Sequence, residues 1–428
     1  MIDLMYTTLT RLSWPCLRIL PWTRLRKGKE IKGRTEERFG KTNTPRPQGK
    51  IIWIHAASNG EALSALPLVN YLINLPSAPT ILMTTMTVTA ASLITQRTNS
   101  DNVIHQFIPY DHPAWIKRFH AHWSPDMVVW IESELWPNHL KAIQSLKVPA
   151  VLLNARLSDK SLHRWHHASQ WFRNLMNTFT IILAQTERDK NNIESLGVTN
   201  VSVKGNLKDL SLPLPFDEFA LQDLKNCIGK RPTLLYASTH DPEEEAACEI
   251  HSKLKAKFPD LLTIIVPRHP KRGHDIALTC KNNGYDVALR SLKMSPQIAT
   301  DIYIADTLGE LGVFYSLCSI TFIGNSLGCK PGGGHNLLEP AWFDCAIVSG
   351  DDLHNFSVLA QEMPEVNACK IIHDKNDLYT TLKVLLEDIA LQNTLASNAL
   401  KYVASKQESG LKEIIKAIQP SCKSAGLL

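Results

Sequence analysis

The residues with the clearest chemical potential lie in the stretch 320–343, ITFIGNSLGCKPGGGHNLLEPAWF. Glycines end an apolar β-branched run and fill the turn after it: Gly324, Gly328, Gly332, Gly333 and Gly334. Asn336 and Glu339 then open an apolar segment, predicted as a helix over 339–345. Glycine lets the backbone approach a ligand closely, and a helix N-terminus attracts phosphate. The pattern predicts a phosphate-binding turn. The alternative is a loop with a helix cap, because Asn-x-x-Glu resembles a capping box.

A rigid cationic turn is predicted at IIVPRHP, residues 264–270. The strand ends at Val266, and Arg268 and His269 then stand between two prolines. Proline fixes φ and so restricts the loop. An arginine guanidinium recognises phosphate through two parallel hydrogen bonds. We therefore interpret Pro267 and Arg268 as part of an anion site.

Two further strand ends carry the pattern S/T-x-G-E, at residues 58–61 and 307–310. Glu61 and Glu310 could simply be capping-box residues that stabilise a helix start. The preceding glycine is less easily explained, because glycine costs a helix about 1 kcal/mol relative to alanine. Its presence favours the approach of a ligand to this backbone.

Two more groups of charged residues follow strands. Glu132 and Glu134 come directly after an apolar run, MVVWI, and Lys208 follows a Gly-Asn turn at 205–206. Carboxylates near an indole suit acid–base work, and a lysine could neutralise a phosphate or a carboxylate. The alternatives are a solvated turn and an ordinary surface lysine.

Composition narrows the function classes. The chain has 428 residues, 44% hydrophobic and 20% charged, with a net charge of +5, which does not favour nucleic acid as a partner. Its nine cysteines are scattered without a CxxC pair, which favours a reducing compartment over disulfides or a zinc site. No acidic cluster suggests a metal site, so we predict neither a metal nor a cofactor.

The N-terminus is predicted to lie on a membrane surface. Apolar residues recur at the spacing of one helical face: Met5, Leu9, Leu12, Cys16 and Ile19. Trp14 and Trp22 are followed by a basic run: Arg24, Arg26, Lys27, Lys29, Lys32, Arg34 and Arg38. An interrupted apolar run is too short to span a bilayer, but an apolar face with a basic flank suits an anionic surface. The alternative is a helix packed on its own domain.

Apolar strands and helical stretches alternate over the rest of the chain, which predicts parallel sheets covered by helices. The pattern breaks at prolines near 213–232 and then restarts. We expect two Rossmann-like, doubly wound α/β domains facing a cleft. The expected parts are a membrane-associating segment (1–40), an acceptor-binding domain (41–210), a linker (211–232) and a nucleotide-sugar domain (233–428).

Taken together, these segments resemble the family that transfers 3-deoxy-D-manno-octulosonic acid (Kdo) onto lipid A precursors. The motifs run in order from residue 53 to residue 340: WIHAASNGE, TTMT, PYDHP, IESELWPN, LNARLSDKS, QTERD, VKGNLK, ASTHDPEEE, PRHP, DTLGELG and PGGGHNLLEP. The resemblance implies a GT-B fold, a CMP-Kdo donor, a lipid A precursor (lipid IVA) as acceptor, no metal, and inversion at the anomeric carbon. It also implies a peripheral or monotopic protein at the cytoplasmic face of a bacterial inner membrane.

The resemblance assigns roles to particular residues. Glu61 would be the general base, while Lys208 and Glu134, with Glu132 as its rival, would stabilise the transition state. The CMP contacts would be Pro267, Arg268, Leu308, Gly309, Glu310, Asn336, Leu337, Leu338 and Glu339. The chain departs from the family pattern at Asn59, at Asn325 and in its longer glycine loop, where Lys330 would supply the cation.

Two alternatives stay open at this point. One is a GT-B transferase that uses a different nucleotide sugar on a lipid acceptor. The other is a non-catalytic, nucleotide-binding membrane protein.

Overall fold

The structure is a computed structural model that describes residues 2–98, 100–132, 134–210 and 212–428. Met1 of the predicted N-terminal segment, Ser133 of the IESELWPN motif and Ser211 of the predicted linker lie outside the described residues. The chain forms two compact units. Unit 1 comprises Met1–Ser211 and Gln407–Leu428, and unit 2 comprises Leu212–Lys406.

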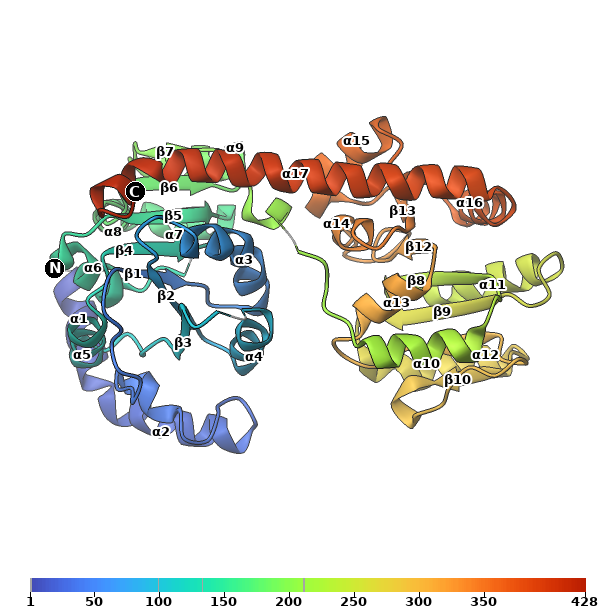
Figure 1. Ribbon diagram of the computed structural model, residues 1–428, viewed down its shortest axis with the longest axis horizontal. Coiled ribbons are helices and arrows are strands. Elements are labelled where there is room, and N and C mark those ends of the chain that lie inside the picture. The colour runs from blue at the N-terminus through green and yellow to red at the C-terminus, as the bar shows by residue number, and fades with distance from the viewer. Residues whose placement is uncertain (1, 99, 133, 211) are drawn as a thin grey trace. The chain divides into compact units, whose positions relative to one another are not determined.

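Unit 1 is built on a parallel sheet of seven strands in the order β3-β2-β1-β4-β5-β6-β7 (Figure 1). The strands are β1 (Ile51–His55), β2 (Thr80–Thr85), β3 (Val103–Phe107), β4 (Met127–Ile131), β5 (Ala150–Ala155), β6 (Ile181–Ala184) and β7 (Val201–Ser202). Its helices are α1 (Ile2–Leu12), α2 (Trp14–Arg26), α3 (Asn59–Ile73), α4 (Val88–Arg97), α5 (Pro113–Trp123), α6 (Pro137–Leu146), α7 (Asp159–His166), α8 (Ser169–Met176) and α9 (Glu187–Ser195).

Both faces of this sheet are buried, because successive side chains along a strand point to opposite faces. Ile52 and Ile54 of β1 pack with α3, α4 and the last turns of the C-terminal helix. Ile51 and Trp53 pack on the other face with α5, α6 and α8. Strands buried on both sides are mostly apolar, which explains the run IIWI at the start of β1.

Unit 2 repeats this architecture with the strand order β10-β11-β9-β8-β12-β13-β14. The strands are β8 (Thr233–Thr239), β9 (Leu262–Pro267), β10 (Val287–Leu289), β11 (Ile302–Ile304), β12 (Ile320–Ile323), β13 (Ala346–Gly350) and β14 (Lys370–Ile372). The helices are α10 (Glu218–Ile228), α11 (Glu243–Lys255), α12 (Gly273–Asn282), α13 (Leu311–Leu317), α14 (Leu338–Ala341), α15 (Ser357–Glu365), α16 (Lys375–Glu387) and α17 (Ile389–Ser424).

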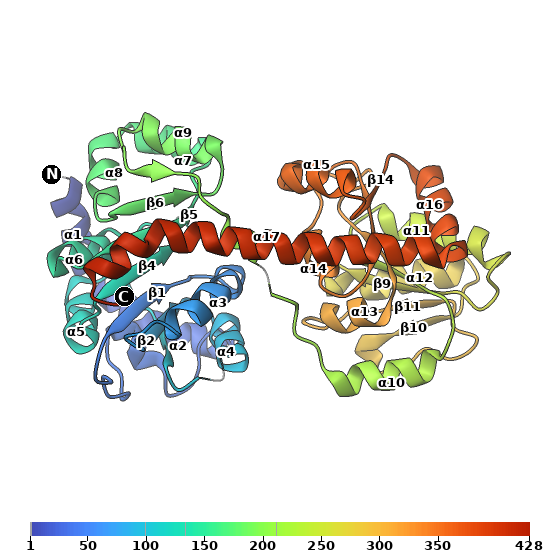
Figure 2. The ribbon, with the colours of Figure 1, turned by 45° about the horizontal axis from the view of Figure 1, so that its top comes forward.

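The domain boundaries of the structure differ from those expected in two places. Residues 218–228 of the predicted linker form helix α10, whose Leu224 and Ile228 lie in the core of unit 2. Helix α17 contributes its first part to unit 2 and its last part to unit 1 (Figure 2). Its Ile414 and Ile418 complete the core of unit 1, so residues 407–428 belong with the N-terminal residues.

Each sheet has one topological switch point, where neighbouring strands connect in opposite directions. In unit 1 it lies between β1 and β4, and in unit 2 between β8 and β12. In open parallel sheets, ligands bind beyond the carboxyl ends of the strands at this point. Glu61 follows β1 and Glu132 follows β4, whereas the glycine loop follows β12.

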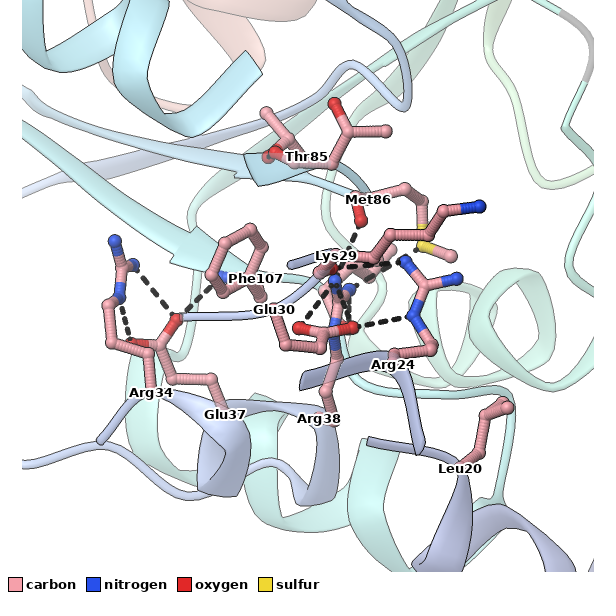
Figure 3. A network of polar contacts seen from close by, with 12 residues as sticks. Leu20, Arg24, Lys29, Glu30, Arg34, Glu37, Arg38, Thr85, Met86 and Phe107 are labelled. Carbon is pink, nitrogen blue, oxygen red and sulfur yellow. Dashed lines mark hydrogen bonds and ion pairs between the residues drawn. The ribbon is translucent and has the colours of Figure 1, made fainter. Parts of the chain in front are cut away.

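A buried ion pair within the N-terminal segment holds Arg38, which ties this segment to the rest of unit 1 (Figure 3). Arg38 is fully buried, and its Nε and Nη2 each donate to Glu30 Oε2 over 3.2 Å. Its Nη2 also donates to the Met86 carbonyl over 2.7 Å. Burial lowers the pKa of Arg38, and the Glu30 carboxylate opposes that shift. The pair fixes the end of this segment beside β2.

Not all of the basic residues from Arg24 to Arg38 are available to a membrane surface, although the prediction from the sequence counted them all. Arg24 pairs with Glu30 at 2.8 Å, and Arg34 pairs with Glu37 at 2.7 Å. Four basic side chains remain exposed: Arg26, Lys27, Lys29 and Lys32.

The apolar residues of α1 and α2 are largely exposed. Leu4 and Leu12 are each 72% exposed, and Trp22 is 65% exposed. Within the described part of the chain, no helix is both long and apolar enough to cross a membrane.

Removing Glu30 tests the anchoring pair. Glu30→Ala leaves the Arg38 cation buried without its carboxylate, and we expect a loss of about 3 kcal/mol in stability. Glu36→Ala is the matched control, because its ion pair with Lys41 is exposed and worth less than about 1 kcal/mol. Thermal melting of the full chain measures both. Equal melting temperatures for the two variants would contradict the anchoring role.

Candidate functional site

Glu61 is a buried carboxylate in the first turn of α3. The Ser58 hydroxyl caps the helix by accepting from the Glu61 N–H at 3.3 Å. Glu61 Oε2 accepts from the Ala57 N–H at 2.8 Å. Burial raises the pKa of Glu61, the bonds from Ser58 and Ala57 oppose this, and the charges of Glu132 and Glu134 raise it further. The carboxylate is thus poised as a base stronger than an ordinary glutamate.

The predicted capping box at residues 58–61 is only partly formed, because the carboxylate bonds one residue before the cap. Gly60 has open space where a side chain would begin, with no atom within 4 Å of an added Cβ. This open space would let a ligand approach the backbone at Gly60.

Glu132 and Lys208 come together in unit 1. Lys208 Nζ lies 3.6 Å from Glu132 Oε1, and Asn154 Nδ2 donates weakly to the same oxygen at 3.4 Å. Glu132 and Asn154 end neighbouring strands, and both have left-handed backbones, with φ of 60° and 59°. Two such residues are energetically costly and cluster at functional sites.

Glu134 is held differently from Glu132. Its Oε2 accepts from the Trp136 indole N–H at 3.0 Å, and its carbonyl accepts from the Trp130 indole at 2.9 Å. Both carboxylates act electrostatically on Glu61, so the structure gathers Glu61, Glu132 and Glu134 in one region. Lys208 is the cation of this group.

A small cavity of about 70 Å³ adjoins the group and is lined by Glu132, Arg156 and Trp165 among mostly apolar residues. A larger cavity of about 550 Å³ lies at the opposite, amino-terminal edge of the sheet. None of the predicted site residues lines this larger cavity.

Unit 2 gathers cationic and imidazole side chains at the ends of β8, β9 and β12. The Arg268 N–H donates to the Thr239 carbonyl at 3.0 Å, which fixes the PRHP turn beside the β8 loop. The His240 and His269 rings are 5.6 Å apart, and those of His240 and His335 are 5.5 Å apart. Arg268 is thus surrounded by three histidines, of which sequence reasoning singled out only His269.

Glu243 holds these loops in place, and sequence reasoning missed it. It is 1% exposed. Its Oε2 accepts from the N–H groups of His240 at 3.0 Å and Asn325 at 2.7 Å. Its Oε1 accepts from those of Ser326 at 3.0 Å and Leu327 at 3.1 Å. One carboxylate therefore joins the β8 loop to the glycine loop.

The glycines of this loop are present for a different physical reason from the one expected from the sequence. Gly332 to Gly334 all have positive φ, and a Cβ at any of them would lie within 2.2 Å of residues 352–355. These glycines are required by packing against the chain itself, and not by ligand approach alone. Asn325 adopts φ of 58°, a left-handed conformation that asparagine tolerates, and donates through Nδ2 to the Gly332 carbonyl at 2.8 Å.

The helix predicted over 339–345 is only one turn long, α14. So short a helix has little dipole, which removes that basis for the expected phosphate site, and the phosphate site itself stays a prediction. Asn336 Oδ1 accepts from the Leu338 N–H at 3.1 Å. Burial raises the pKa of Glu339 to about 7, while Arg268 and Asn336 act to lower it. Leu337 and Leu338 are buried in the core and contribute packing.

The turn at 307–310 is not a capping box. Glu310 pairs with Arg290 and accepts from the Thr307 hydroxyl, and Arg290 lowers the pKa of this carboxyl. Gly309 has φ of +83°, so its backbone explains the glycine. Leu308 is exposed beside it.

In the described part of the chain, no three His, Cys, Asp or Glu side chains gather in a way that could hold a metal ion. All nine cysteines lie among the described residues and are free thiols.

Comparison with known proteins decides the family. Residues 33–210 match the family described as 3-deoxy-D-manno-octulosonic-acid transferase (kdotransferase). The chain is 34% identical to the 3-deoxy-D-manno-octulosonic acid transferase of Rickettsia felis over 84% of this chain and 76% of that protein. The chain belongs to the Kdo transferase family.

Other relatives agree with this assignment. The Kdo transferase of Haemophilus influenzae is 31% identical to the chain, with 97% of each sequence covered. A glycosyltransferase structure from Rickettsia africae covers 88% of this chain and 99% of its own, with a TM-score of 0.58 at 10% identity, which shows a shared fold. This member of the Kdo transferase family therefore has two GT-B-like units, each with a parallel seven-stranded sheet.

The sequence carried a signal for Glu243 that was hard to read. It is the first of three consecutive glutamates, 243–245, which could all be first-turn acids that favour the helix dipole. Only the structure separates the buried Glu243 from the exposed Glu245.

Removing the Glu243 carboxylate should loosen both loops of this Kdo transferase. Glu243→Ala leaves four buried N–H groups without their acceptor, and we expect a loss of about 3 kcal/mol or more. Hydrogen exchange at the amides of residues 325–327 should accelerate, and the melting temperature should fall. Glu245→Ala is the matched control and should change neither. Unchanged exchange in Glu243→Ala would refute the role of this carboxylate.

Proposed function

We propose that the protein transfers Kdo from CMP-Kdo to a lipid A precursor, lipid IVA, with inversion at the anomeric carbon. The observation that carries this proposal is the buried Glu61 of a Kdo transferase, at the switch point of unit 1. Its raised pKa suits a general base that must accept a proton near neutral pH.

The reaction proceeds as a single displacement. Glu61 accepts the proton of the acceptor hydroxyl while that oxygen bonds to the anomeric carbon of Kdo. The bond from that carbon to the phosphate oxygen breaks, and its electron pair leaves with CMP. One displacement inverts the anomeric centre. The transition state has oxocarbenium character in the sugar and growing negative charge on the phosphate.

The other charged residues of unit 1 fit a supporting role. The carboxylate of Glu134, with Glu132 as its rival, would stabilise the positive charge that develops on the sugar. Lys208 already lies 3.6 Å from Glu132, so it can balance the carboxylates when no substrate is bound. The backbone of Glu132 is left-handed, which costs conformational energy. Such strain is typical of functional sites, so it supports a role for this residue.

Unit 2 would hold the CMP part of the donor. Arg268 offers a bidentate guanidinium for the phosphate. The turn at 308–310 and residues 336–339 would contact the nucleoside. Glu339, with a pKa of about 7, can act as a hydrogen-bond donor or acceptor to a sugar hydroxyl.

We further propose that α1 and α2 lie on the cytoplasmic face of a bacterial inner membrane, where the lipid acceptor is found. Their exposed leucines and tryptophans would enter the headgroup region. The exposed basic side chains Arg26, Lys27, Lys29 and Lys32 would attract anionic lipids.

Replacing the base tests the chemistry. Glu61→Gln should lower Kdo transfer by about 100-fold or more, because no group then accepts the proton. Mass spectrometry of lipid IVA incubated with CMP-Kdo measures the product. In the wild-type protein, transfer should rise with pH through a pKa above that of an ordinary glutamate.

The matched control is Glu187→Gln, which alters an exposed first-turn glutamate of α9 in the same unit. It should transfer Kdo at the wild-type rate. Full activity in folded Glu61→Gln would refute the base, and an unchanged lipid mass with wild-type protein would refute the transferase itself.

Charging the apolar face tests the membrane proposal. Leu9→Asp combined with Leu12→Asp should abolish flotation of the protein with vesicles of anionic phospholipid, because buried carboxylates are costly in the interface. Ile298→Asp alters an exposed apolar side chain in unit 2 and is the control. Equal flotation of both variants would count against α1 as the contact.

A further inference from the structure

The structure contains an imidazole pair for which the family resemblance gives no role. His240 follows β8, and His335 lies in the glycine loop after β12. Their Nε2 atoms are 3.3 Å apart, and their ring planes are inclined by only 24°, so the two nitrogens face each other edge to edge. Both side chains are half-buried, and Glu243 fixes the β8 loop and the start of the glycine loop that carry them.

Two ring nitrogens at this distance can hold only one hydrogen between them. One nitrogen must then be a neutral acceptor, because two N–H groups would place hydrogens and like charges against each other. Burial and the nearby charges of His240, Arg268 and His269 lower the pKa of His335 to about 4. Burial, with the charge of His269, also lowers the pKa of His240.

The groups facing the pair are mostly cationic. His240 is influenced by His269, Glu244, Arg272 and Arg268. Glu244 and Arg272 form an ion pair at 2.7 Å and largely cancel each other. The charges of Arg268 and His269 remain, so the free protein resists a further proton here. A bound anion would reverse that balance.

We propose that the His240–His335 pair takes up a proton from solvent when the phosphate of CMP binds beside Arg268. This inference rests on the proposed function, because it deepens the role of unit 2 as the donor site. No covalent bond forms or breaks in this step. The second proton breaks the contact between the ring nitrogens and leaves two N–H donors for phosphate oxygens.

The negative charge that the CMP phosphate can carry increases during the reaction, so proton uptake would favour the products. The phosphate of CMP-Kdo is a diester with one negative charge. After the sugar departs, CMP carries a monoester with a second ionisable oxygen. A pair that gains a proton therefore stabilises the leaving group more than the bound donor, which is the differential binding that catalysis needs.

Calorimetric titration of the full chain with CMP at about pH 6.5 tests the proposal. Measured in two buffers of different ionisation enthalpy, the binding heats should differ and report uptake of up to about one proton per CMP. His335→Gln and His240→Gln should each lose most of this difference and bind CMP several-fold more weakly. His373→Gln is the control, since His373 is exposed and pairs with Asp351. It should behave as the wild type does.

The outcomes separate this inference from the function that it deepens. Equal heats in the two buffers for the wild-type protein would overturn the proton uptake alone, as would undiminished uptake in both glutamine variants. No CMP binding would overturn the inference together with the donor role of unit 2. Loss of Kdo transfer to lipid IVA with proton-linked CMP binding intact would overturn the transferase and leave the pair standing. Melting curves identify a variant that fails to fold, and the wild-type measurement decides the matter without it.

Discussion

The candidate donor site depends on one buried carboxylate, Glu243, which accepts four backbone N–H groups from two loops. The loops that carry His240 and Asn325 follow the neighbouring strands β8 and β12. Burying a charge is costly unless hydrogen bonds compensate for it. Burial raises the pKa of Glu243, and the four N–H groups oppose that shift. The same bonds that favour its ionised form therefore hold the two loops together.

The two units position their polar residues through the same feature of the fold. Parallel strands buried on both faces leave no room for chemistry except at their ends. At the switch point the connections before and after diverge, so a gap between loops arises from the topology alone. Glu61 and Glu132 use the gap of unit 1, and Arg268 and the glycine loop use the end of the sheet in unit 2.

The strand–helix alternation and the ends of the central strands followed from the sequence, because apolar runs bounded by polar turns have few other solutions. The strand before the PRHP turn was predicted to end at Val266, and β9 ends at Pro267. The edge strands β7, β10 and β14 were missed, since two or three residues show no periodicity. Helix α10 was hidden by the prolines before it. The helix cap from Ser58 to the Glu61 N–H could be predicted from the local motif. The contacts of Glu243 and His335 could not, because they join residues far apart in sequence and leave no local pattern.

Burial alone does not decide what a carboxylate does in this protein. Glu61 and Glu339 both have raised pKa values, and burial is the main cause in each. Glu61 has hydrogen bonds from residues 57–58 that lower its pKa and like charges beside it that raise its pKa. Glu339 faces Arg268, whose cation would be shared with a bound phosphate. In the proposed donor site, a phosphate bound to Arg268 would weaken the stabilisation of ionised Glu339 and so favour its protonated, hydrogen-bond-donating form. A nucleotide bound there would thus change the protonation of the groups around it.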